Sequence, residues 1–455
     1  MLRKCKGNAC CCVMLNSKAN ILTIFPHRKS IALNYLLFVV YLVPLCWLLL
    51  RVPFVKRSGI DGRVLTGLFL FKIAAGIAIG WISLNIYGTG NDYWDVNKEG
   101  WIEYQLLISD PGEYFTNIFT SAYPHEYSGM FGSGDSFWND LKGNIVIKLV
   151  SVFNIFSRGD YYINSLFFNF LIFFGHIALY RVFIKIYPGR LIRVIIGCFL
   201  LPSMIYFSSG IHKDGLVFLM LAILIYCIFF SLKYRFTIKR LAFIITTLGM
   251  LFLLRNFIVF ALVPAVFAWV LSVKAKWRPF KSFAVVYVLT GIILFTSGAT
   301  GFFNPLQIIT QKQADYLNLP VSATQIELST LSPHIKSFVN NVPEAINHAI
   351  MRPYVTELPV NSILPLSIEL AFYQLLFLLF LFFRQKNTDP ANNSFLWFTV
   401  FFSFTGLLLI GYISPNLGSL VRYRSLYLPF LITPLICQIN WKKIKKIFKL
   451  KNNII

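Results

Sequence analysis

The chain has 455 residues, of which 57% are hydrophobic, and a formal net charge of +24 at pH 7. This composition excludes an ordinary soluble protein, which would expose large apolar patches to water. The apolar residues stand in blocks of membrane-spanning length, typical of an all-α, polytopic transmembrane helical bundle. The net charge does not indicate nucleic-acid binding, because the basic residues lie in short runs at the ends of these blocks, as the positive-inside rule requires.

Residues 1–30 contain four clustered cysteines, without a second cluster or a histidine at zinc spacing. We interpret this segment as an N-terminal leader without a function of its own, with Met14 as an alternative start. Residues 31–440 are expected to form the transmembrane domain. Residues 441–455 are expected to be a basic cytoplasmic tail that faces anionic lipid.

The first two spans are predicted at 31–50 and 64–87, joined by a basic cytoplasmic turn, so residues 88–143 are expected to be extracytoplasmic. This outer segment holds half of the chain's 18 acidic residues. A helix lying at the membrane interface is predicted over 144–157.

The remaining spans bring the expected total to eleven, with a second extracytoplasmic loop over 301–362. Proline at 202 should kink one of them, and Arg255 with Asn256 should mark the junction between two short helices. The N-terminus is then outside, in conflict with its basic residues. These spans are 161–183, 191–208, 215–232, 241–254, 257–272, 282–300, 363–383, 394–413 and 425–440.

The acidic segment begins with Asp92 and Asp95, a few residues beyond the second span. A carboxylate so placed can be a general base or can hold a divalent metal ion, Mg²⁺ or Mn²⁺. If 95–105 is helical, Asp95, Glu99 and Glu103 share one face. The alternative is a solvated acidic surface without chemistry.

Two groups of basic residues are expected on the extracytoplasmic side, where lysine and arginine are normally rare. Lys213 lies in the turn SSGIHKDG, where it can bind a lipid-linked phosphate or pair with Asp214, and His212 can carry a proton or rest at the interface. Arg422 and Arg424 lie in the sequence VRYR; guanidinium groups bind phosphate in a bidentate fork, or snorkel to lipid headgroups.

Three further ionisable residues are candidates. Arg352 can bind an anionic group or pair with Glu357. Arg255 and Glu369 lie within apolar spans, where an ionisable side chain marks a site by default. The sequence contains no P-loop, GxSxG, HExxH or paired CxxC motif, so any energy should come from an activated substrate or an ion gradient.

The layout resembles the GT-C class of membrane glycosyltransferases, through the GNDYWD segment, the stretch 144–157, the SSGIHKDG turn and the final VRYR. The resemblance implies a lipid-phosphate-linked sugar donor and a glycan or lipid acceptor. It implies that Asp92 is the base or metal-binding carboxylate and that Lys213, Arg422 and Arg424 hold the donor phosphate. The acidic segment follows a second span instead of the first, which implies an extra N-terminal helix.

Two alternatives remain open. A polymerase or ligase of lipid-linked surface polysaccharide would make His334, His348, Arg352 and Arg422 central, without a metal. A transporter or flippase of the same glycans would depend on Glu369 and Arg255. All three readings place the chain among membrane lipids, in a plasma membrane such as the bacterial inner membrane.

Overall fold

The computed structural model describes residues 31–86, 88, 91–121, 123, 136–297, 304–320, 322–357, 360–385 and 390–452. These residues are predominantly helical, and the only β-pairings among them are two isolated bridges, Gln325 with Asn416 and Arg384 with Ile439. The all-α class is thereby confirmed. The predicted leader with its cysteines, and the acidic residues Glu126 and Asp135, lie outside the described residues.

Within the described residues, eight helices are long and apolar enough to cross a membrane, or nine if the bent pair α8 (Leu191–Phe199) and α9 (Pro202–Ser209) forms one span. The chain is therefore a multi-pass helical membrane protein, while the expected eleven crossings remain a prediction. The eight are α1 (Ile31–Arg51), α3 (Gly62–Asn85), α7 (Tyr161–Ile186), α10 (Lys213–Lys233), α11 (Ile238–Lys274), α12 (Pro279–Thr296), α15 (Val360–Phe383) and α16 (Pro390–Ile413).

The predicted kink at Pro202 is confirmed, because α8 and α9 meet there at 48°. Proline has no N–H to donate to the preceding turn, and its ring clashes with the carbonyl four residues earlier. The predicted last span, 425–440, holds a shorter helix than expected. Helix α17 (Leu417–Arg424) ends before it, and α18 (Leu428–Gln438) has only 11 residues.

Helix α11 breaks at Arg255, whose backbone is non-helical (φ −152°, ψ 78°). A straight helix of its 37 residues would be about 55 Å long. Its two ends nevertheless lie together, since Nζ of Lys274, the last residue, is 5.5 Å from the ring of Phe236, just before the first. The two halves therefore fold back on each other, with Arg255 and Asn256 at the turn as the sequence predicts.

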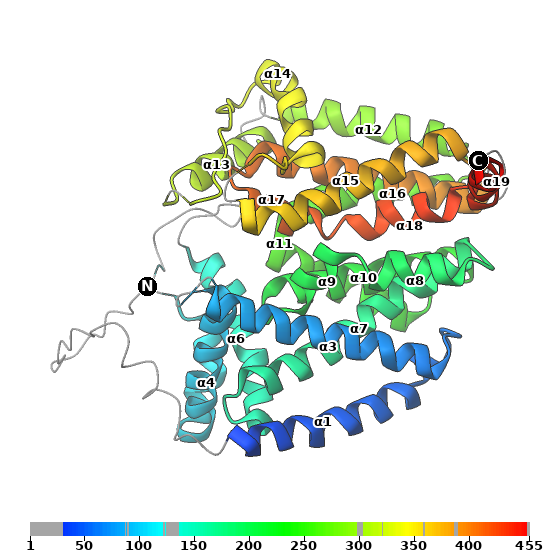
Figure 1. Cartoon of the computed structure of the whole chain (residues 1–455). Coiled ribbons are helices and arrows are strands. Elements are labelled where there is room, and N and C mark those ends of the chain that lie inside the picture. Colours follow the sequence, from blue (N-terminus) through cyan, green and yellow to red (C-terminus); the bar gives the residue numbers. More distant parts are fainter. Residues whose placement is uncertain are drawn as a thin grey trace. The chain divides into compact units, whose positions relative to one another are not determined.

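The chain forms two compact units. The first comprises the described parts of Met1–Tyr127 and Asp135–Leu171, with Ser209–Lys213. Besides α1, α3 and the start of α7, it contains α2 (Pro53–Lys56), α4 (Asp92–Ser109), α5 (Pro111–Thr116), the 3₁₀ helix η1 (Asn117–Phe119) and α6 (Phe137–Ser157). In Figure 1, α4 runs crosswise to α1 and α3, as a helix at a membrane surface does.

Most described residues of the acidic segment are helical. The side chain of Asn91 caps α4 by accepting from the amide of Trp94 at 3.2 Å, and Ser136 caps α6. Helix α6 therefore begins at Phe137, earlier than the predicted 144. It packs closely on α4 because Gly100 has no side chain; a Cβ there would lie 2.6 Å from Cγ1 of Val150.

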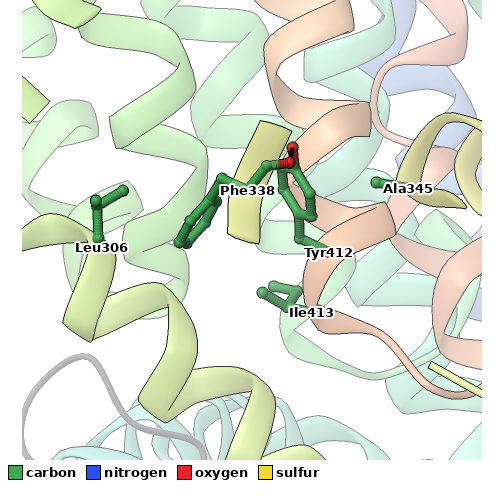
Figure 2. Close-up of a cluster of buried hydrophobic side chains, with 5 residues drawn as sticks. All are labelled: Leu306, Phe338, Ala345, Tyr412 and Ile413. Atoms are coloured by element: carbon green, nitrogen blue, oxygen red, sulfur yellow. Dashed lines mark hydrogen bonds between the residues drawn. The ribbon is translucent and has the colours of Figure 1, made fainter. Parts of the chain in front are cut away.

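The second unit holds the remaining helices, including α13 (Pro305–Leu317), α14 (Ile335–Ile346), the π-helix η3 (Asn347–Met351) and α19 (Trp441–Asn452). Figure 2 shows a buried apolar cluster where α13 and α14 meet the end of α16: Leu306, Phe338, Ala345, Tyr412 and Ile413. The hydroxyl of Tyr412 donates to the carbonyl of Phe338 at 2.8 Å. Helices α13 and α14 of segment 301–362 thus pack onto the end of α16.

Gly411 allows this packing, because a Cβ there would lie 2.0 Å from the carbonyl oxygen of Ala345. Gly411→Ala should therefore push α14 away from α16 and lower the free energy of unfolding by about 1–3 kcal/mol. The control is Gly249→Ala in α11, where nothing lies within 4 Å and the better helix propensity of alanine should stabilise by up to about 1 kcal/mol. Unfolding in detergent micelles measures both, and equal stability of the two variants would contradict this packing.

Candidate functional site

A buried ionic cluster in the second unit joins three segments that are distant in sequence. Asp214 lies in the first turn of α10, Arg255 at the break of α11, and Arg422 on α17. Oδ1 of Asp214 accepts from Nη2 of Arg255, and Oδ2 accepts from Nε of Arg422. The side chains of Asp214 and Arg255 are each 4% exposed, and that of Arg422 is 19% exposed. The structure thus brings together two of the predicted arginines on one carboxylate.

Arg255 keeps unused hydrogen-bond donors. Its Nε and Nη1 are buried and have no acceptor in the part of the chain that the structure describes. Its guanidinium carbon lies 4.2 Å from the centre of the Tyr423 ring and 5.8 Å from that of Phe257. A buried donor without a partner costs about 1–3 kcal/mol, and more on a charged group. These nitrogens are therefore suited to an anionic ligand, and a phosphate group fits a guanidinium best.

Lys312, which was not predicted from the sequence, lies near the same aromatic ring as Arg255. It lies on α13 and is 8% exposed. Its Nζ is 5.8 Å from the centre of the Phe257 ring and 6.0 Å from that of Tyr316, whose hydroxyl is 2.7 Å from the hydroxyl of Tyr423. The available signal was the one used for Lys213, a basic residue in a predicted outer segment.

Asp92 and His212 form a pair in the first unit. Asp92 is the first residue of α4 and its side chain is 62% exposed; its Oδ2 lies 3.7 Å from Nε2 of His212, which is 9% exposed. The His212 ring lies 6.0 Å from that of Tyr93, and Gly210 packs so closely on Tyr93 that a Cβ would be 2.4 Å from its Cε1. The sequence-predicted Asp92 is therefore accessible and has an imidazole beside it.

The other carboxylates of α4 differ in their surroundings. Asp95 lies at the surface, where partial burial of its carboxyl group raises its pKa; the charge of Lys98 opposes this shift and that of Asp92 adds to it. Glu103 is buried and its Oε2 lies 2.6 Å from Nζ of Lys148.

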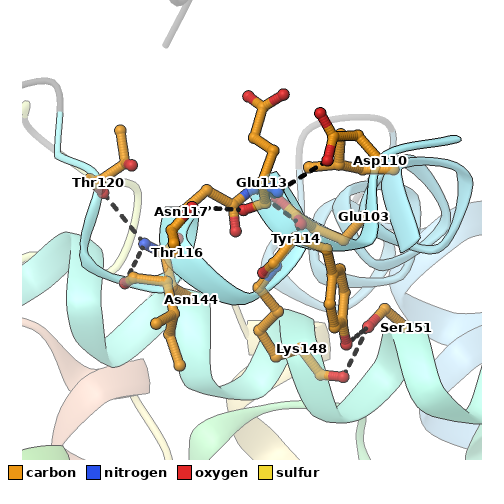
Figure 3. A network of polar contacts seen from close by, with 12 residues as sticks. Glu103, Asp110, Glu113, Tyr114, Thr116, Asn117, Thr120, Asn144, Lys148 and Ser151 are labelled. Atoms are coloured by element: carbon orange, nitrogen blue, oxygen red, sulfur yellow. Dashed lines mark hydrogen bonds and ion pairs between the residues drawn. The ribbon is translucent and has the colours of Figure 1, made fainter.

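Figure 3 shows the network around Glu103. Its carboxylate accepts from Asn117, and the Lys148 ammonium lies 3.6 Å from the centre of the Tyr114 ring and donates to the carbonyl of that residue. The Tyr114 hydroxyl is 2.7 Å from Oγ of Ser151. These contacts tie α5 and η1 to α4 and α6, so Glu103 has a structural role.

Arg424 is more deeply buried than Arg422 and contacts a different part of the second unit. It is 5% exposed, and its Nη1 donates to the carbonyls of Ala349 at 3.2 Å and Arg352 at 2.6 Å. Burial lowers the pKa of its guanidinium to about 10, with the charge of Glu369 opposing that shift, so Arg424 is charged at neutral pH. It therefore anchors the end of η3 to α17.

The two histidines of segment 301–362 differ in burial. His348, in η3, is 3% exposed, and its Nδ1 has no hydrogen-bond partner among the described residues. Burial, and next the charge of Arg352, lower its pKa, so the imidazole is neutral at pH 7. Arg352 pairs with Glu357 at 3.0 Å. His334 is exposed at the start of α14.

Glu369 and Lys213 were also predicted as site residues. Glu369, on α15, accepts through Oε1 from the amide and hydroxyl of Ser203, both at 3.0 Å, and from the hydroxyl of Tyr373 at 2.5 Å. Lys213 is the first residue of α10 and belongs to the first unit. Among the described residues, no three His, Cys, Asp or Glu side chains are grouped as metal ligands. That Asp92 binds Mg²⁺ or Mn²⁺ remains a prediction.

Fold and site together define a multi-pass helical membrane protein with a buried arginine cluster on a single carboxylate. No protein-family model, curated protein or solved structure matches the chain.

Proposed function

We propose that this chain is an integral membrane glycosyltransferase, which moves a sugar from a polyprenyl-phosphate-linked donor to a glycan or lipid acceptor at the extracytoplasmic face. The observation that carries the proposal is the buried guanidinium of Arg255, with two donors that have no acceptor in the described part of the chain. A buried cation with open donors next to a second arginine supports binding of a phosphate headgroup.

This cluster would act on the leaving group. When the bond between the sugar carbon and the phosphate oxygen breaks, the electron pair stays with the phosphate, and its negative charge grows. Guanidinium groups already oriented by Asp214 stabilise that charge without reorganising. Arg424 takes a positioning role in this proposal, because its Nη1 donates to two backbone carbonyls.

Asp92 is the proposed base. Its exposed carboxylate would take the proton of the acceptor hydroxyl as the new bond to the sugar carbon forms. His212 would orient the carboxylate. Where a divalent cation such as Mg²⁺ takes part, Asp92 would be its protein ligand.

A polymerase or ligase of lipid-linked polysaccharide is the second candidate, and His348 favours it. A buried neutral imidazole with an unpartnered Nδ1 is able to accept a proton from an acceptor hydroxyl. Arg352 and Arg424 adjoin the same π-helix, and π-helical turns are frequent at functional sites.

Arg255→Gln tests phosphate binding in the purified protein, with farnesyl phosphate as a short polyprenyl donor analogue. Loss of a charge-assisted hydrogen bond, worth about 1.5–3 kcal/mol, should weaken binding at least about tenfold. The matched control is Arg278→Gln, which removes an exposed arginine before α12 and should leave the affinity unchanged. Equal affinity of both variants, each folded by size-exclusion chromatography, would refute the proposed role of Arg255.

A further inference from the structure

We propose that α19, together with the end of α15 and the turn before α8, forms a binding surface for the headgroups of anionic phospholipids. The sequence alone indicated a basic tail that faces such lipids. The structure adds that α19 is docked on the second unit, and that arginines from two other segments lie at the same end of its helices. The inference does not depend on the proposed function.

Helix α19 is fixed to the second unit by its first turn. Ile444 is buried, and Trp441 is half-buried, with its Nε1 donating to the carbonyl of Ile436 at 3.0 Å. The side chain of Asn440 caps the helix by accepting from the amide of Lys443 at 3.1 Å. Figure 1 shows α19 nearly end-on at the end of α16 and α18, which run across the view. A basic helix with this placement is typical of one that lies along a membrane surface.

The end of α15 places α19 at the level of the lipid headgroups. Phe382, near the end of α15, is 75% exposed, as a side chain that faces lipid tails is, and the exposed Arg384 follows two residues later. Arg384 forms an antiparallel bridge with Ile439, and the amide of Asn440 donates to the carbonyl of Phe383 at 2.8 Å. Paired residues of such a bridge have their Cα atoms about 5 Å apart. Helix α19 therefore begins where the apolar surface of α15 ends.

Arg190 brings a third segment to the same end of the second unit. It directly precedes α8, and its Nη2 donates to Oε1 of Gln385 at 2.8 Å. The backbone amide of Gln385 donates to the carbonyl of Gln438 at 2.9 Å, and the side chain of Gln438 donates to the hydroxyl of Tyr187 at 2.8 Å. These bonds join the turn between α7 and α8 to the ends of α15 and α18, so the basic residues of all these segments contribute to one surface.

This surface carries a concentrated positive charge. The sequence has no Asp or Glu between residues 161 and 213 or after residue 389, and Asp389 lies outside the described residues. Each lysine or arginine near an anionic membrane surface adds to the attraction, and guanidinium groups also bind phosphate through paired hydrogen bonds. The cations are the half-buried Arg190 and the exposed Arg384, Lys442, Lys443, Lys445 and Lys446.

Exposed apolar side chains beside these cations favour a phospholipid over a soluble polyanion. Leu191 and Ile192 are exposed and directly follow Arg190, and Phe382 stands close before Arg384. A nucleic acid or an acidic polypeptide has no acyl chains to cover these side chains. A phospholipid covers them with its acyl chains and presents its phosphate to the basic groups. A bound anionic lipid would therefore hold the ends of α8, α15 and α19 together.

Binding of dioctanoyl phosphatidylglycerol to the full-length protein in dodecyl maltoside micelles tests this surface, with dioctanoyl phosphatidylcholine as the neutral probe. Wild-type protein should bind phosphatidylglycerol at least about tenfold more tightly, since only this headgroup carries a net negative charge, and salt should weaken the preference. Arg384→Gln should reduce the preference severalfold, because the surface extends beyond α19. The preference should disappear in the quadruple variant Lys442→Gln, Lys443→Gln, Lys445→Gln and Lys446→Gln.

The matched control carries four substitutions of exposed basic residues around the ends of α11 and should keep the preference: Arg235→Gln, Lys239→Gln, Lys274→Gln and Lys276→Gln. An equal loss in this control would show a general effect of charge and overturn the assignment. Equal affinity of wild-type protein for both lipids, an unchanged preference in the folded quadruple variant, or tighter binding of polyglutamate would also overturn it. An unchanged preference in Arg384→Gln would refute the surface of three segments. The wild-type ratio and Arg384→Gln decide the assignment if the quadruple variant does not fold.

Discussion

Asp92→Asn should reduce glycan transfer by about 10²–10⁴-fold, the usual contribution of general-base catalysis. The amide has nearly the same shape but cannot take the proton of the acceptor hydroxyl. Asp92 is 62% exposed and begins α4, where Asn91 provides the helix cap, so the variant should still insert and fold. Transfer of radiolabelled glycan by protein reconstituted in liposomes measures the effect.

Two matched variants make the result specific. Glu99→Gln removes another exposed carboxylate of the same helix and should leave transfer unchanged. His348→Gln should have a small effect if Asp92 is the base. Full activity of Asp92→Asn combined with loss of activity in His348→Gln would identify His348 as the base and favour the polymerase or ligase.

Asp214→Ala should lower the free energy of unfolding by about 3–5 kcal/mol, the usual cost of removing one partner from a buried ion pair. The substitution leaves the guanidiniums of Arg255 and Arg422 without the carboxylate that both contact. The control, Glu327→Ala, removes an exposed carboxylate of the same unit and should change stability little. Unfolding of the purified variants in mixed micelles measures both.

A triple variant separates electrostatic from steric causes. Asp214→Leu, Arg255→Met and Arg422→Met together replace the ionic cluster by apolar side chains of similar size, which is often neutral or stabilising. This variant should recover most of the lost stability and bind no phosphate lipid. Stability as low as that of Asp214→Ala would show that the cluster stabilises by shape and not by charge balance.

The placement of most helices could be predicted from the sequence, because a bilayer requires long apolar runs and leaves no water for exposed backbone groups. Local chemistry also predicted two breaks correctly, at Pro202 and at Arg255, since proline removes a backbone donor and an arginine is costly in lipid. The number of membrane-spanning helices was harder to predict, since α18 has only 11 residues, which is short for a bilayer.

The candidate site was predictable only in part. Arg255, Arg422, Asp92 and His212 stood out because each is ionisable in an unusual place. The sequence could not tell Arg422 from Arg424, two residues apart on one short helix. The first pairs with Asp214, whereas the second is enclosed by carbonyls of Ala349 and Arg352.

By itself, the sequence determined that this protein is helical, lies in a membrane and carries half of its carboxylates in a segment after the predicted second span, because hydrophobicity and charge act through local composition. Only the tertiary structure decided which charges meet. Glu103 pairs with Lys148, and Lys312 and Arg255 lie at the same distance from the ring of Phe257. Such pairings arise from packing between helices distant in sequence, which no local pattern records.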